Sequence, residues 1–143
     1  MGSYIEAFSA GAIFYSQYLM KEKGLSRKDI DSVVISFVEK LDWVDGVIVR
    51  SKLESEDNLT ALERLYKNSF HPDKSGDLHV IPKPHWISTS SGASHGSPYK
   101  WDRHVPMVFA GYNLKPIYVK NKVRTVDFAP TIGRLLNLEI PKN

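Results

Sequence analysis

The sequence predicts an α/β domain in which short strands alternate with helices. Two observations support this class. Apolar residues recur at helical spacing between residues 26 and 41, and short apolar runs bounded by glycine or charged residues lie on either side. With 143 residues, 42% of them hydrophobic, the chain suits one domain with a buried core. We therefore expect a single domain over residues 1–143, with residues 1–3 resembling the remnant of an expression tag.

The first apolar segment, residues 4–20, is rich in aromatic side chains and has Ser9-Ala10-Gly11 at its middle. This pattern favours two short strands joined by a glycine-containing loop. A single buried helix is the alternative, because short apolar runs are not separated by their period alone. Gly24 closes the charged stretch that follows.

The clearest element is a helix that begins after Ser26. Ser26 and Asp29 form a capping pattern in which each side chain can satisfy an exposed amide of the first turn. Its apolar stripe contains six residues: Ile30, Val33, Val34, Phe37, Val38 and Leu41. After the break at Asp45-Gly46, residues 47–49 predict a buried strand that ends at Arg50.

A second helix is expected from about Ser55 to Asn68. Acidic residues Glu56 and Asp57 would lie at its positive end, with basic residues near its negative end. Its apolar face would consist of Leu59, Leu62, Leu65 and Tyr66.

Residues 69–104 differ in character from the rest of the chain and contain all five histidines. Residues 78–81 and 86–88 could be strands, but Pro82 and Pro84 argue against a regular central ladder. Loops of this small, polar and proline-containing composition commonly carry function.

The C-terminal part predicts two extended pieces and a helix. Residues 105–110 form an apolar strand candidate ended by glycine, and residues 118–119 suggest a second extended piece. Thr125 or Asp127 can cap a final helix, provided that Pro130 falls in its first turn.

Composition excludes several function classes. The absence of cysteine excludes disulfides, thiolate zinc sites and cysteine nucleophiles. No apolar run is long enough to span a membrane, and the net charge of +3 is interspersed, so we expect neither a membrane span nor nucleic-acid binding. The glycine-rich phosphate-binding motifs G-x-x-x-x-G-K-[ST] and G-x-G-x-x-G are missing from the sequence.

The histidines do not predict a self-contained metal site. None are two residues apart, as on one face of a strand, or three to five apart, as on a helix. We therefore read His71, His79 and His85 as surface or packing residues.

Three stretches carry a specific resemblance: NSFHPDKSGDLHVIPKPHWI (68–87), GASHGSPYKWDRHVPMVFAGYNLKP (92–116) and TVDFAPTIGRLLNLEIP (125–141). In this order they resemble the C-terminal part of the catalytic domain of the alkaline phosphatase superfamily. The nearest branch is that of bacterial periplasmic phosphomonoesterases and type I phosphodiesterase/nucleotide pyrophosphatases. The resemblance implies part of an α/β/α fold, a mixed sheet with flanking helices.

The resemblance also implies chemistry. Such enzymes bind two zinc ions and hydrolyse phosphate esters through a covalent Thr or Ser intermediate. The position of His95 implies a ligand of one zinc ion, while Asp102 and His104 are candidates for orienting His95 through hydrogen bonds. Where the resembling proteins often carry glycine before the tryptophan, this chain has His85. The resemblance places the parent protein in the periplasm or otherwise outside the cytoplasm.

The chain departs from the family pattern because it contains no Asp-His dipeptide and no D-x-x-x-H motif. We expect a C-terminal fragment that lacks the nucleophile and most metal ligands and is inactive alone. Its partner would be a phosphate-ester substrate of the full-length protein, and exposed apolar surface could lead to self-association. The alternatives are a non-catalytic binding module of the same fold and, from the pI alone, a basic nucleic-acid binder.

Overall fold

The computed structural model describes residues 3–55, 57–87, 90–111 and 113–139. They form two compact units, 1–103 and 104–143, each taken by itself below. The prediction of one domain over the whole chain stays a prediction. Within the described residues, no helix is long and apolar enough to cross a membrane.

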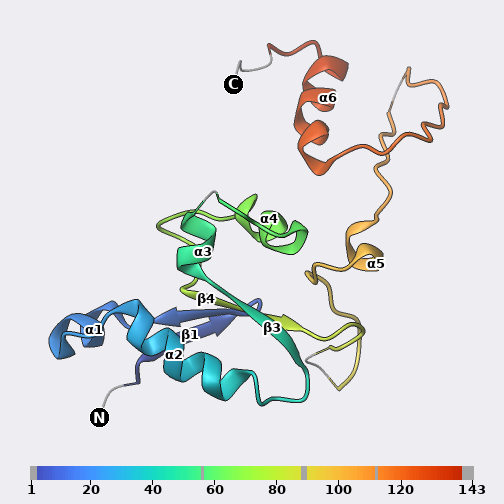
Figure 1. Cartoon of the computed structure of the whole chain (residues 1–143). Coiled ribbons are helices and arrows are strands. Elements are labelled where there is room, and N and C mark those ends of the chain that lie inside the picture. Colours follow the sequence, from blue (N-terminus) through green and yellow to red (C-terminus); the bar gives the residue numbers. More distant parts are fainter. Residues whose placement is uncertain (1–2, 56, 88–89, 112, 140–143) are drawn as a thin grey trace. The chain divides into compact units, whose positions relative to one another are not determined.

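The first unit is built on a four-stranded sheet with the strand order β1-β2-β4-β3 (Figure 1). Its strands are β1 (Ile5–Ser9), β2 (Ala12–Tyr15), β3 (Val44–Val49) and β4 (Leu78–Pro82). Every strand pair among the described residues is antiparallel. The hairpin of β1 and β2 confirms the two-strand interpretation of the first apolar segment, since Ala10 and Gly11 make the turn with positive φ.

Helices cover both faces of this sheet. One face carries α1 (Gln17–Lys23) and α2 (Arg27–Val38); the other carries α3 (Arg50–Glu54) and α4 (Ala61–Lys67). Alternate residues of β4 serve the two layers, because side chains along a strand point to opposite faces. Leu78 and Val80 join the cluster beneath α2, and Ile81 joins the cluster beneath α3 and α4.

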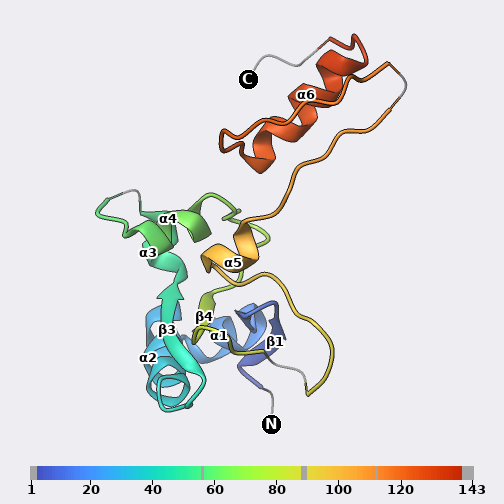
Figure 2. The same cartoon turned by 90° about the vertical axis from the view of Figure 1, so that its right-hand side faces the viewer.

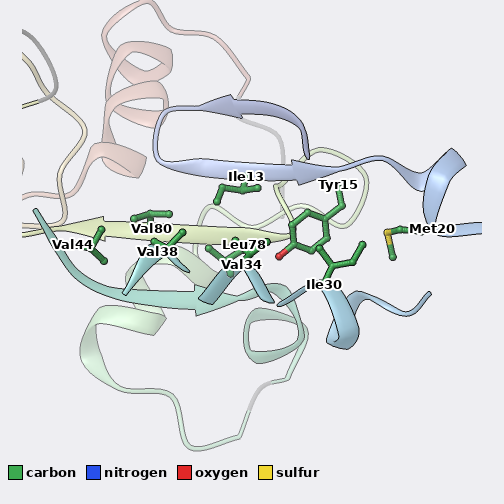
Figure 3. Close-up of a cluster of buried hydrophobic side chains, with 9 residues drawn as sticks. All are labelled: Ile13, Tyr15, Met20, Ile30, Val34, Val38, Val44, Leu78 and Val80. Atoms are coloured by element: carbon green, nitrogen blue, oxygen red, sulfur yellow. The ribbon is translucent and has the colours of Figure 1, made fainter. Parts of the chain in front are cut away.

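The cluster under α2 is the larger part of the core (Figure 3). Its buried members are Ile13, Tyr15, Met20, Ile30, Val34, Val38, Val44, Leu78 and Val80. In β3, a register shift between Val44 and Gly46 changes which residues face α2, so that Val44 and Val47 pack on the same side.

The helix predicted from Ser26 is confirmed as α2, with both hydrogen bonds of the Ser26–Asp29 capping box. Its expected apolar stripe is too wide: Val33 and Phe37 are 69% and 65% exposed. The helices α1 and α3 were not predicted. Their shortness, seven and five residues, leaves too few turns for a periodic apolar pattern.

The second predicted helix is shorter than expected. It begins at Ala61, where Thr60 and Glu63 form a capping box, and not near Ser55. The capping box sets the start of the helix, because the Thr60 side chain accepts the Glu63 amide N–H and the Glu63 side chain accepts the Thr60 amide N–H. Glu56 lies outside the described residues.

The proline argument against a central strand is wrong. β4 lies between β2 and β3, and Pro82 pairs with Val44 as the last residue of the strand. A proline at a strand end interrupts no further ladder bond. Trp86 and Ile87 are not in a strand, and residues 88–89 lie outside the described residues.

The second unit contains a 3-10 turn, η1 (Thr125–Asp127), and α6 (Phe128–Leu135). The predicted final helix is confirmed, with Pro130 in its first turn. Residues 105–110 and 118–119 form no strand, because a strand needs a paired neighbour and the described part of this unit supplies none.

The predicted fold class is confirmed: helices flank a sheet as in the α/β/α arrangement. The sheet itself was expected to be mixed, and the pairs in the described part of the chain are antiparallel.

Candidate functional site

The candidate site is the segment of residues 95–103, which we call the His95 turn. It ends in α5 (Lys100–Arg103), a single helical turn. His95 is exposed at its start, and Gly96 follows with φ +98°. Glycine adopts this conformation at little cost because it has no Cβ.

Two side chains of α5 hold the backbone of the His95 turn. The Asp102 carboxylate accepts a hydrogen bond from the Ser97 amide N–H at 2.5 Å, and Arg103 Nε donates to the Pro98 carbonyl at 2.7 Å. These bonds close the segment on itself, so that His95 stands next to an ordered turn.

Charge and hydrogen bonding keep Asp102 ionised. Hydrogen bonds from the Ser97 side chain and then from its backbone amide lower the pKa of Asp102, with a smaller contribution from nearby His95. The Asp102 carboxylate thus binds the backbone amide of Ser97, two residues from His95. Its predicted role in orienting the His95 imidazole itself stays a prediction.

His104 is exposed and begins the second unit, so its predicted contact with His95 also stays a prediction.

The His95 turn lies against other elements of the first unit. Tyr99 Oη donates to the Pro82 carbonyl at the end of β4, at 2.7 Å. A small hollow of about 150 Å³ lies where the turn meets α4, lined by Leu65, Tyr66, Ser69, Gly96 and Pro98. Its lining carries no charged side chain.

The residues present do not fit a complete metal site. Among the described residues, no group of three His, Asp or Glu side chains is placed to hold a metal ion. A zinc site needs three or four protein ligands.

Three other histidines of the loop occupy surface or packing positions. His71 Nδ1 accepts the Asp73 amide N–H at 3.1 Å, and His79 packs against Tyr66 with ring centroids 5.2 Å apart. Burial lowers the pKa of His79 below its ordinary value. His85 is exposed and stacks on Trp101.

Asp77 is a buried acid of the first unit. Its carboxylate accepts the Tyr15 amide N–H at 2.8 Å and the Arg27 Nε at 2.5 Å. Its own amide N–H donates to the Ile13 carbonyl at 2.8 Å. Asp77 thereby joins β2, the start of α2 and the start of β4.

The neighbourhood of Asp77 is a cavity of about 400 Å³ whose lining includes Arg27 and Arg50. Both guanidinium groups already have protein acceptors. Arg50 donates to the Glu54 carboxylate and to the carbonyls of Ser75 and Pro72. Burial, and then a hydrogen bond to Asp31, raises the pKa of Tyr15. The polar side chains that line this cavity therefore form a structural network.

The fold and the turn define a class: a helix-covered sheet whose interior strand β4 leads to a loop that bears an exposed histidine. The crystal structure of alkaline phosphatase PafA matches 97% of this chain with a TM-score of 0.82 at 20% identity, and the match covers 27% of the PafA chain.

Sequence comparisons agree with this match. Alkaline phosphatase PhoK of a Sphingomonas species is 27% identical over 149 residues, which is 94% of this chain and 26% of that protein. A protein of Myroides odoratus named calcium-transporting ATPase is 33% identical over 118 residues, 78% of this chain and 21% of that protein. No family model matches the chain.

The chain is therefore related to the alkaline phosphatase superfamily and has part of the alkaline phosphatase fold. It spans about a quarter of the length of the curated relatives that it matches.

Proposed function

We propose that this chain is a segment of a phosphate-ester hydrolase and that its contribution to the active site is His95, as one ligand of a zinc ion. The relationship to alkaline phosphatases supports the reaction class. The observation that carries the role of His95 is its place beside a turn closed by Asp102. We propose that the complete enzyme forms a covalent Thr or Ser intermediate and that its nucleophile lies outside this chain.

The isolated chain provides the first test. With added zinc, we expect no turnover of p-nitrophenyl phosphate or of bis-p-nitrophenyl phosphate, because one imidazole cannot hold zinc selectively. Turnover that disappears in His95→Ala would contradict the proposal, since the site would then be complete within this chain.

A graft provides the positive test. Residues 95–103 would replace the matched turn of Sphingomonas PhoK, and phosphatase activity would be measured alongside zinc content. We expect an active graft that loses activity and zinc on His95→Ala, and keeps both when Lys100, an exposed residue of the same turn, becomes Ala. An active graft that is unchanged by His95→Ala would contradict the ligand role.

By the same relationship we propose a location outside the cytoplasm for the parent protein, and a phosphate ester as its substrate. Fractionation of cells that express the natural gene tests the location. Recovery of the protein from the cytoplasmic fraction would contradict it.

We also propose that the chain self-associates through exposed apolar residues. Val33 and Phe37 lie one turn apart on the outer face of α2, both more than three-fifths exposed. Light scattering across a wide concentration range should show species larger than the monomer, and Phe37→Lys should reduce them. A clean monomer at all concentrations would overturn this proposal.

A further inference from the structure

The connection between the His95 turn and the sheet is made by aromatic side chains. The Trp101 ring stacks on Tyr99, with centroids 4.8 Å apart and planes 12° from parallel. It also stacks on His85, at 4.3 Å and 11°. Figure 2 shows α5, which carries Trp101, next to the end of β4.

These contacts form a continuous path from the sheet to His95. The path begins at the Pro82 carbonyl, which accepts the Tyr99 hydroxyl, and Pro82 is paired with Val44 inside the sheet. Tyr99 also accepts the Asp102 amide N–H through its own carbonyl, at 3.2 Å. Asp102 in turn holds the Ser97 amide, two residues from His95.

The backbone of His85, whose ring stacks on Trp101, has an unfavourable conformation. His85 has φ +65°, a left-handed conformation that is uncommon for residues other than glycine. Such a conformation persists when surrounding contacts over-determine it. The ring contact with Trp101 is one such contact.

We propose that Tyr99 is a positioning residue that fixes the His95 turn to the end of β4, assisted by the His85–Trp101 stack. The inference rests on the proposed function in one respect: His95 matters to the reaction only if it is the zinc ligand proposed above. The anchoring itself concerns residues of this chain and requires neither metal nor substrate.

The test is amide hydrogen exchange of the full 143-residue chain, followed by NMR. Tyr99→Phe keeps the ring and removes the hydroxyl that bonds Pro82. We expect exchange at Ser97 to become about fivefold to tenfold faster, the range for losing one hydrogen bond, with a change in the His95 ring signals. The Val80 amide inside the sheet should be unaffected. Tyr18→Phe, the same change at a tyrosine that is 74% exposed on α1, is the matched control.

Two outcomes would overturn the inference. Unchanged exchange at Ser97 in Tyr99→Phe would show that the hydroxyl does not hold the turn. Equal acceleration at Ser97 and Val80 would show a general loss of stability. Trp101→Ala gives an independent check, because it should loosen Ser97 in the same way. The proposed hydrolase function is judged separately, by turnover and zinc content of the graft, so either idea can fail alone.

Discussion

Asp77 and Asp102 perform the same elementary task in different places. Each carboxylate accepts a hydrogen bond from a backbone amide, Tyr15 for Asp77 and Ser97 for Asp102. Asp77 is 4% exposed and paired with Arg27, whereas Asp102 lies on a single-turn helix at the surface. The Asp77 carboxylate connects three elements of the core, whereas the Asp102 carboxylate bonds only within its own loop.

In this unit, the carboxylate that stabilises the fold (Asp77) and the carboxylate that orders the candidate site (Asp102) are different residues. A buried carboxylate without its partners is costly, so the Asp77 network is part of what the fold requires. A surface carboxylate competes with water for its donor, so the Asp102 contact sets local order and contributes little to overall stability.

Removal of the buried acid should have the largest effect. Asp77→Ala leaves the buried Tyr15 amide unpaired and Arg27 without its counterion. We expect a loss of about 3 kcal/mol in the free energy of unfolding, measured by urea denaturation. Asp77→Asn keeps an acceptor for Tyr15 and should cost about half as much. Equal stability of Asp77→Ala and the wild type would contradict the structural role.

Gly76 should give the next largest effect. A Cβ at this position would lie 2.9 Å from both the Ile13 carbonyl oxygen and the Ala12 Cβ, so Gly76→Ala must displace β2. We expect a loss of about 2 kcal/mol in the same measurement. Gly46→Ala is the control because nothing lies within 4 Å of its added Cβ. The close approach would be disproved if both variants unfolded at the same urea concentration.

His79 should make stability depend on pH. Its pKa is lowered in the folded state by burial, so the unfolded chain binds a proton first as pH falls. Stability should therefore be constant above the ordinary histidine pKa of 6.5 and decrease below it. His79→Asn should flatten this part of the profile, while His104→Asn, at an exposed position, should not. An unchanged profile in His79→Asn would assign the acid sensitivity to other groups.

The smallest global effect is expected at Asp102. Asp102→Asn should leave the urea midpoint within error, because the residue is at the surface of a local turn. Exchange of the Ser97 amide should nevertheless become faster, since a neutral amide oxygen is the weaker acceptor. A large shift of the urea midpoint would show that the turn belongs to the core.

Local sequence signals predicted the elements whose causes are local. The Ser26–Asp29 box marked the start of α2, and the Ser9-Ala10-Gly11 segment marked the hairpin. The central position of β4 could not be predicted, because it depends on which strands pair on either side of it. A proline at the end of that strand was misread for this reason.

The candidate site likewise has a part that could be predicted from the sequence and a part that could not. His95 was predicted as a metal ligand through a resemblance, because an isolated loop histidine has no local signature, and that role stays a prediction. Its anchoring contacts were not predictable, since they join Tyr99 to Pro82 and Trp101 to His85 across 17 and 16 positions of the sequence. Only the folded chain brings these pairs together.

Hydrogen exchange at two amides tests the central contrast most directly. The Tyr15 amide, held by Asp77, should exchange only through global unfolding, with a free energy of opening equal to that from urea denaturation. The Ser97 amide, held by Asp102, should open locally at a lower free energy that is insensitive to denaturant. Equal free energies of opening at Tyr15 and Ser97 would contradict the account.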